Sequence, residues 1–394
     1  MRQPAGAAYR GYVLAGLCGS LVGIGLARFA YTPLIPAVIA AGWFGAAQAA
    51  YLGAANLTGY LAGALGARAV ARRVPLPLIL RISMLVAALS FFACAAPLSF
   101  AWFFAWRFVA GIVGGFIMVL AAPAVLALVP AGRRGLAGGV IFTGVGLGIA
   151  ASGTLVPPLL RLGLPAAWLG LGAVSLALTL ASWASWPATA PRFEAGRTRL
   201  GAAVWAVIAE YGLVAFGAVP HMIFLVVFVA RGLNRGMAAG AACWVAFGLG
   251  AMLGPTIAGA LADRIGFRLA LRLVLPLVAL AVAAPVLSHA TLVLFASSAV
   301  VGAFTPGIVP LVLGHIHMMV PPGSEAARAA WGGATVAWAV GQAVGAQALS
   351  AVFARTGGYG ALFAVGAVMM ALALALDILA GMSLSTARAE RETG

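Results

Sequence analysis

The chain has 394 residues, of which 64% are hydrophobic and only 8% are charged. An ordinary soluble domain has about 45–50% apolar and about 25% charged residues, so this composition excludes a soluble globular protein and favours a lipid bilayer. The net charge of +16 comes from arginines in short runs between long apolar segments, a pattern typical of membrane topology signals, and we expect no nucleic-acid partner.

Twelve apolar runs are long enough to cross about 30 Å of hydrocarbon, which takes roughly 20 helical residues. The first begins like a signal peptide, but it continues through Arg28 and eleven more follow, so we expect no cleavage. The sequence predicts an all-α integral membrane protein with twelve transmembrane helices over residues 12–38, 48–67, 76–96, 101–128, 137–159, 166–186, 203–229, 238–261, 269–288, 291–318, 329–353 and 360–382.

The arginines also indicate how the spans are oriented. With the N-terminus in the cytoplasm, seventeen of the 23 arginines lie on the cytoplasmic side, four lie outside, and Arg28 and Arg107 lie within spans. Positive residues accumulate in cytoplasmic loops. We therefore expect a multi-pass protein of the cell inner membrane with both termini in the cytoplasm.

Similar segments recur about half a chain apart. The sequence "AGAL" at 62–65 recurs at 258–261, and the same offset of 196 residues places Gly111 on Gly307. Parallel repeats are a recognised transporter architecture, with the solute site between the halves near the membrane midplane. We expect two parallel-repeat bundles of six helices, over 1–186 and 203–394, joined by a cytoplasmic loop at 187–202.

Several motifs carry a resemblance to a known family. The stretch "GALADRIGFR" (259–268) resembles the G-x-L-a-D-R-x-G-r signature of the major facilitator superfamily, and Arg107 followed by Gly111 resembles the R-x-x-x-G element of its fourth span. The glycine-rich stretch 144–159 is similar to its fifth-span motif. The segments "GIGLARFAYTPLIPAV" and "YLGAANLTGYLAGAL" are similar to the YbfB/YjiJ-type branch, which implies no firm substrate.

The resemblance implies a conformational latch. In proteins of this superfamily, the loop aspartate pairs with arginines and a helix N-terminus when the cytoplasmic side is closed, which assigns Asp263, Arg264 and Arg268 to such a latch. The 196-residue offset pairs Asp263 with Ala67, so we expect a latch in the second half only. The alternative is that Asp263 is a helix-end residue that faces water.

Arg28 and Arg107 are candidate solute-binding residues. An arginine at mid-membrane costs at least about 2.5 kcal/mol, so it normally faces a polar cavity or an acidic partner. The alternatives are a structural pair with a carbonyl or, chiefly for Arg107, snorkelling to the outer interface. Pro33 and Pro36 are expected to break or bend the first span beyond Arg28 and to free backbone groups, which makes Tyr31 and Thr32 further ligand candidates.

The second half holds the titratable candidates. Glu210 and His315 lie near the cytoplasmic ends of their spans and are assigned to proton coupling. His221 and Gln342 are assigned to solute binding. Asn56 could hydrogen-bond a ligand, and Asp377 could act as a proton relay. For each of these residues a purely structural role is the alternative. His315 and His317 point to different sides of a helix, so we predict no metal site.

These features favour a secondary active transporter that works as a monomer, by alternating access and without a cofactor. The basic cavity favours a small organic anion, with a proton or another ion as the coupling ion. An efflux carrier for hydrophobic or cationic drugs is the alternative, and a channel is a further one that solute counterflow would exclude. We find no HExxH or GxSxG motif and no pair of carboxylates within one span, so we predict no enzyme.

Overall fold

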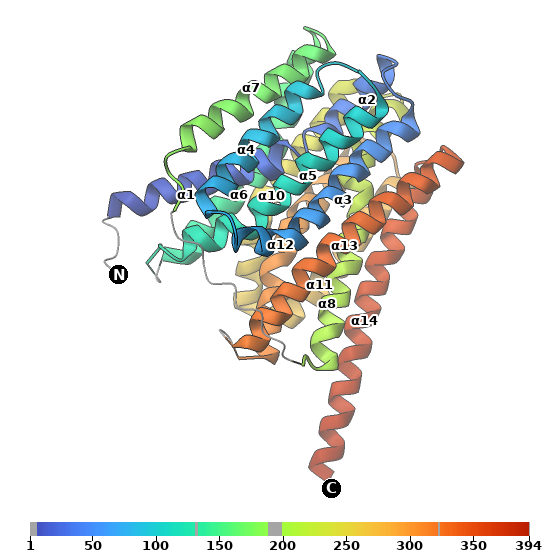
Figure 1. The fold of residues 1–394 in the computed structure, drawn as a ribbon. Coiled ribbons are helices and arrows are strands. Elements are labelled where there is room, and N and C mark those ends of the chain that lie inside the picture. The colour runs from blue at the N-terminus through green and yellow to red at the C-terminus, as the bar shows by residue number, and fades with distance from the viewer. Residues whose placement is uncertain (1–5, 131–132, 188–198, 322–323, 394) are drawn as a thin grey trace.

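The computed structural model describes residues 6–130, 133–187, 199–321 and 324–393, and all regular structure in this part of the chain is helical. Figure 1 shows one bundle of long helices that run roughly along a common direction. The first span consists of α1 (Gly6–Ser20), the π-helical η1 (Leu21–Leu26) and α2 (Tyr31–Ala40). The seventh consists of α8 (Ala202–Gly217), η3 (Pro220–Phe224), α9 (Leu225–Val227) and η4 (Phe228–Gly232).

Each of the other ten spans is a single helix. Their bounds are α3 (Ala46–Ala71), α4 (Leu76–Ala93), α5 (Phe100–Leu126), α6 (Arg134–Leu160), α7 (Leu164–Ser182), α10 (Gly236–Ile265), α11 (Phe267–Leu287), α12 (Thr291–Met319), α13 (Glu325–Thr356) and α14 (Gly360–Thr393). Serine side chains cap the first turns of α5 and α13. Gly266, with a φ of +84°, lets the chain turn directly from α10 into α11.

All twelve predicted spans are therefore present as helical segments, which confirms the all-α membrane fold. Eleven of the described segments are long and apolar enough to cross a membrane, and α3 falls outside that set. Its 26 residues nevertheless extend about 39 Å at 1.5 Å per residue. The helix packs between α5 and α13, where its many alanines and glycines allow close approach.

The duplication is visible in the helix bounds, but its register differs from the sequence-based one. The starts of α4 and α11 are 191 residues apart, and so are those of α5 and α12 and of α6 and α13. The expected offset of 196 fits only the pairs α1 with α8 and α7 with α14. The internal repeat is therefore real, and its middle spans are shifted by five residues from the predicted alignment.

Helix contacts at glycine support the corrected register. A methyl group at Gly59 would lie 2.0 Å from the carbonyl oxygen of Phe108, and one at Gly250, 191 residues on, would lie 2.2 Å from that of Ala299. The same offset pairs Gly111 with Gly302, so the expected match of Gly111 with Gly307 is wrong. Small residues recur about every helical turn in these spans, which makes a shifted alignment look plausible.

The correction also changes the counterpart of one latch residue. In the second and eighth spans the register places Asp263 opposite Arg72, and the predicted pairing with Ala67 is wrong. Neither Ala67 nor Arg72 supplies an acid, so the first-half loop still lacks the aspartate of the family signature.

The two halves touch along several pairs of spans. Helix α3 packs on α13 and η3, α6 packs on α10, and α2 packs on α9 and α10. Most of the predicted loop at 187–202 lies outside the described residues, so the division into two bundles at that loop stays a prediction. The contact between the broken first and seventh spans is where the candidate site lies.

Candidate functional site

The first span breaks at residues 27–30, between η1 and α2. Pro33 has no N–H to donate to the carbonyl of Phe29, four residues earlier. The N–H of Thr32 donates to that carbonyl instead, at 3.2 Å, and this leaves the carbonyl of Arg28 without its helical partner. The predicted break is therefore present, and it frees backbone acceptors inside the protein.

Arg107 of α5 binds these freed carbonyls. Its Nη1 donates to the oxygen of Ala27 at 2.8 Å and its Nη2 to that of Arg28 at 3.3 Å. The guanidinium carbon also lies 4.5 Å from the centre of the Tyr31 ring, within range of a cation–π contact. Arg107 is only 3% exposed. This geometry matches the structural pair with carbonyls that was the alternative to a solute-binding role.

Arg28 has a different environment. Its Nη2 donates to Oε1 of Gln342, on α13 of the second half, at 2.6 Å. Its guanidinium carbon lies 4.9 Å from the ring centre of Phe29 and 5.0 Å from that of Tyr60. Its Nε is buried and has no hydrogen-bond partner among the described residues. Arg28 is thus held by two rings and one amide and keeps unused donors.

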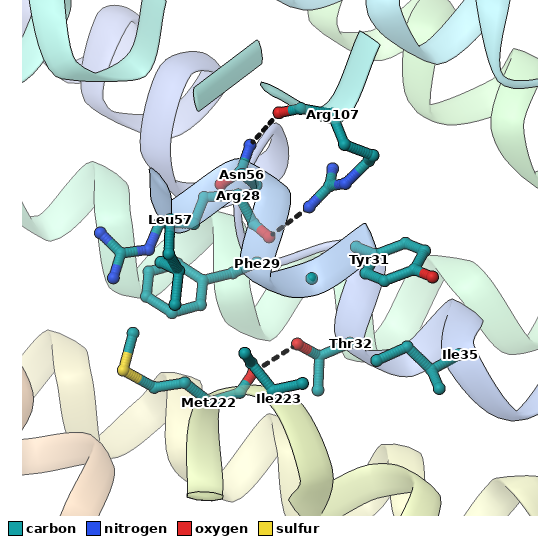
Figure 2. A pocket seen from close by; sticks show the side chains of 11 residues that line it. Arg28, Phe29, Tyr31, Thr32, Ile35, Asn56, Leu57, Arg107, Met222 and Ile223 are labelled. Atoms are coloured by element: carbon teal, nitrogen blue, oxygen red, sulfur yellow. Dashed lines mark hydrogen bonds between the residues drawn. The ribbon is translucent and has the colours of Figure 1, made fainter. Parts of the chain in front are cut away.

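The two arginines line one cavity at the break, which we call the Arg28 cavity (Figure 2). It encloses about 270 Å³ of non-atom space, part of which is open to solvent. Its polar lining consists of Arg28, Tyr31, Thr32, Asn56 and Arg107, and the rest of the lining is Phe29, Ile35, Gly53, Leu57, Met222 and Ile223.

The two hydroxyl groups in this lining have backbone partners. The Tyr31 hydroxyl donates to the carbonyl of Ala49 at 2.9 Å. The Thr32 hydroxyl donates to the carbonyl of Met222 on η3 at 2.6 Å, and Figure 2 shows this bond across the junction of the two halves. The lining of the cavity therefore includes a direct contact between the first and seventh spans. Ligand contacts by Tyr31 and Thr32 stay a prediction.

Gln342 joins this group, whereas His221 does not. Gln342 is 1% exposed and bonds Arg28 through Oε1, while its Nε2 lies 3.6 Å from the sulfur of Met222. His221 is fully buried beside Ser297 of α12 and packs edge-on against Phe363 of α14. The structure thus brings five of the six predicted solute-binding residues together and places His221 inside the second half.

The tautomer of His221 follows from its partner. The Ser297 hydroxyl donates to the carbonyl of Ala281 at 2.6 Å, so its oxygen can only accept from Nε2 of His221, at 2.7 Å. The proton is therefore on Nε2, and Nδ1 is a buried acceptor without a partner among the described residues. This arrangement suits a neutral ring that packs three helices together.

A second polar group lies between α8, α11, α12 and α14, and we call it the buried acid cluster: Glu210, Arg272, His315 and Asp377. Arg272 and Asp377 form an ion pair. Glu210 is 1% exposed, and its Oε1 has no partner among the described residues. The helices of Glu210 and His315 pack, respectively, on the helices of Asp377 and Arg272, whose ion pair the sequence did not predict. The expected proximity of Glu210 and His315 stays a prediction.

The latch residues lie near the turn between α10 and α11. Asp263 and Arg264 are exposed, and neither has an ion-pair partner in the described part of the chain. Arg268 is half-buried, and its Nε lacks a hydrogen-bond partner there. No ion pair of the latch is thus formed among the residues that the structure describes, and the role of these residues stays a prediction.

Tyr60 and Met222 were not expected at the site. A signal for Tyr60 exists, because it follows Asn56 by four residues and so lies on the same face of α3. Met222 follows two residues after Pro220, in the broken part of the seventh span. Among the described residues, no group of three or more His, Cys, Asp or Glu side chains could hold a metal ion.

Comparisons with known proteins agree with this architecture. A family model described as "Uncharacterised MFS-type transporter YbfB" matches residues 20–378. The fold is similar to the crystal structure of a bacterial homologue of the human lysosomal transporter Spinster in an inward-facing, unoccupied conformation. The TM-score is 0.65, with 16% identity over 96% of each chain. No curated protein sequence matches the chain.

Proposed function

We propose that this chain, which belongs to the YbfB-type family of major facilitator superfamily transporters, carries a small organic anion across the membrane by alternating access. Family and fold establish a multi-pass membrane transporter. The nature of the solute rests on the Arg28 cavity. Of the two arginines that line this cavity, Arg28 leaves most of its hydrogen-bond donors unused. The lining residues include no acid that would neutralise its charge.

The energetic argument is the cost of keeping such a group in the membrane. An arginine near mid-membrane costs at least about 2.5 kcal/mol. For Arg107 two carbonyl bonds offset that cost. For Arg28 the described residues supply one amide oxygen and two ring faces. An anionic solute would supply the missing acceptors, because a guanidinium presents several donors in a planar fork that fits a carboxylate.

Alternating access is supported by the contacts of residues 28–32 with the other half. Arg28 bonds Gln342, Thr32 bonds Met222, and the Phe29 ring lies 6.0 Å from that of Trp244. These contacts would have to break for the two halves to separate on the side of the membrane where the Arg28 cavity lies. The site therefore lies where solute binding and the relative position of the halves can affect each other.

The buried acid cluster supports coupling to protons. A buried carboxylate is costly to keep ionised when an oxygen lacks a hydrogen-bond partner, as Oε1 of Glu210 does among the described residues, so protonation is a natural way to remove its charge. The neighbouring pair Arg272 and Asp377 gives the cluster a second acid and a cation that can exchange partners. We assign Glu210 and His315 to proton coupling, and this assignment is independent of the solute.

We further propose a monomer in the cell inner membrane with both termini in the cytoplasm, on the strength of the arginine distribution. An efflux carrier for hydrophobic cations is the second candidate, because Phe29, Leu57, Met222 and Ile223 give the cavity apolar walls. Such a carrier would need an acid at its site, whereas Glu210 belongs to a separate cluster and is not in the cavity lining.

The test compares Arg28→Lys with wild type for equilibrium binding and for counterflow in proteoliposomes, using carboxylates, neutral solutes and lipophilic cations. Arg28→Lys keeps the charge but loses the planar fork, so we expect anion binding to weaken by roughly 1–3 kcal/mol. Neutral and cationic ligands should bind unchanged. Arg235→Lys is the matched control, because Arg235 is exposed and bonds Thr291, away from the cavity.

Binding of lipophilic cations alone would overturn the anion proposal in favour of drug efflux. Anion binding of equal strength in wild type and Arg28→Lys would also overturn the role of Arg28. Counterflow distinguishes a carrier from a pore, because a carrier exchanges labelled for unlabelled solute whereas a pore only equilibrates it.

A further inference from the structure

Three buried polar atoms of residues that line the Arg28 cavity lack hydrogen-bond partners among the described residues. They are Nε of Arg28, Nε of Arg107 and Oδ1 of Asn56. Buried polar groups are nearly always paired, and those left unpaired in a protein call for an explanation such as a ligand or a water molecule. Two of these atoms are donors and one is an acceptor. The residues that line the cavity therefore carry both kinds of unpaired group.

The identity of the free atom on Asn56 is fixed by its neighbour. Asn56 is 1% exposed, and its Nδ2 donates to the backbone carbonyl of Arg107 at 3.1 Å (Figure 2). The opposite amide orientation would place Oδ1 against that carbonyl oxygen, with two acceptors facing each other. Oδ1 is thus the unpaired atom. An amide oxygen accepts hydrogen bonds and cannot donate them, so its partner in a ligand must carry a donor.

The charge of the ligand follows from the difference between the two arginines. Two donors of Arg107 already bind the carbonyls of Ala27 and Arg28. Arg28 donates one N–H to a neutral amide, so it keeps more free donors than Arg107. One available guanidinium can pair with one carboxylate. A second carboxylate would lie against the apolar side chains of Ile35, Leu57 and Ile223, where a charge without a partner is costly. The cavity thus favours a monoanion.

The donor for Asn56 is a hydroxyl and not an ammonium group. An ammonium group would be a further cation beside Arg28 and Arg107, and the lining residues include no acid to compensate it. A neutral hydroxyl satisfies Oδ1 without that repulsion. The apolar side chains in the lining favour hydrocarbon in the rest of the molecule, and the small size of the cavity favours a short chain.

We infer that the Arg28 cavity binds a small hydroxy monocarboxylic acid, with the carboxylate on Arg28 and the hydroxyl on the Asn56 side-chain oxygen. This inference rests on the proposed function, since it names the class of organic anion. It adds Asn56 as the residue that determines specificity.

The experiment uses purified full-length protein and pairs of acids of three to six carbons that differ only in a 2-hydroxyl group, such as propanoate and 2-hydroxypropanoate. Binding is measured by thermal shift and by equilibrium titration. We expect the hydroxy acid of at least one pair to bind about five- to tenfold more tightly, the effect of one hydrogen bond. The matching 2-amino acid, diol and dicarboxylate should bind more weakly than that hydroxy acid.

The variant Asn56→Leu should remove the preference within the pair and leave the affinity for the unsubstituted acid within about twofold, because the ligand hydroxyl is the only ligand group that loses a partner. The carbonyl of Arg107 also loses its Nδ2 donor, but this cost is the same for both acids of a pair. Thr58→Val is the matched control, since Thr58 lies on the same helix but bonds Gln347 and Ala54 and does not line the cavity. The control should keep the wild-type preference. If Asn56→Leu does not fold, the comparison of each hydroxy acid with its unsubstituted partner on wild type still tests whether the site prefers a hydroxyl group.

The outcomes separate the two proposals. Equal binding within every pair, lost together in Arg28→Lys, would overturn the hydroxyl inference, because a water molecule then satisfies Asn56, and would leave the anion proposal standing. Tighter binding of the 2-amino acid would overturn the choice of hydroxyl over ammonium. Binding of no carboxylate would overturn both proposals.

Discussion

Arg107 and Arg28 should respond differently to the same substitution. In Arg107→Lys a single ammonium group replaces a guanidinium that bonds two carbonyls, at 2.8 and 3.3 Å. The shorter lysine can retain at most one of these bonds, and a hydrogen bond to a charged group contributes about 1.5–3 kcal/mol. The 3.3 Å bond is long, so we expect a loss near the lower end, about 1.5 kcal/mol of the free energy of unfolding.

Arg107→Leu should cost more, because it leaves the carbonyls of both Ala27 and Arg28 without a protein partner. At about 1–3 kcal/mol for each unsatisfied group, the loss is roughly 2–6 kcal/mol, and water entering the Arg28 cavity would bring it toward the lower figure. Arg28→Lys is the control. Among the described residues, Arg28 makes a single side-chain hydrogen bond, to the Gln342 amide oxygen, and an ammonium group can make that bond too, so the stability of this variant should stay within about 1 kcal/mol of wild type.

The assay is unfolding by denaturing detergent in mixed micelles, followed by circular dichroism on wild type and the three variants. Solute binding is measured on the same samples. We expect Arg107 variants to lose stability and Arg28→Lys to lose anion affinity. If Arg107→Lys is as stable as wild type and loses anion affinity as Arg28→Lys does, Arg107 is a solute ligand and its assignment to a structural role is wrong.

Three further predictions concern the coupling of the site to the rest of the protein. Glu210→Gln should abolish gradient-driven uptake in proteoliposomes and retain counterflow, because exchange needs no net proton movement; intact accumulation would move the coupling role to His315 or another group. Asp263→Asn should change the transport rate and the labelling of cysteines near the α10–α11 turn while affinity stays within a few-fold; a large loss of affinity with unchanged labelling would contradict the latch. Thr32→Val removes the hydroxyl that bonds Met222 across the halves and should shift the conformational equilibrium about fivefold, measured by spin-label distances between the halves; an unchanged distribution would show that this bond does not bias the equilibrium.

The fold was predictable because its main determinants are local. The length of an apolar run and the arginines between runs are properties of the sequence alone, and the twelve spans follow from them. The register of the repeat was not predictable from the sequence, because small residues recur at every turn of α3 and α10. The 191-residue offset emerges from the helix bounds and from contacts such as Gly59 with Phe108 and Gly250 with Ala299.

The site was predictable in part for the same reason. The insertion cost of an arginine singles out Arg28 and Arg107 without any structure. Their different roles depend on which carbonyls the break at 27–30 frees and on which arginine reaches them, and both are three-dimensional facts. Arg272 shows the same limit, because its position predicts a topology signal whereas its partner Asp377 lies 105 residues away.

The geometry of Arg28 suggests how solute binding would reach the interface between the halves. Gln342 belongs to the second half, and its amide oxygen occupies an N–H of Arg28 that a bidentate carboxylate would use. A solute that takes this donor weakens one contact between the halves and adds its own contacts to the first. A ligand shifts a conformational equilibrium only by its difference in affinity for the two states. One exchanged hydrogen bond, about 1 kcal/mol, corresponds to a shift of roughly fivefold. Such a shift is modest. Two further contacts would therefore have to loosen before the halves separate at the Arg28 cavity. They are the bond between Thr32 and Met222 and the packing of Phe29 on Trp244.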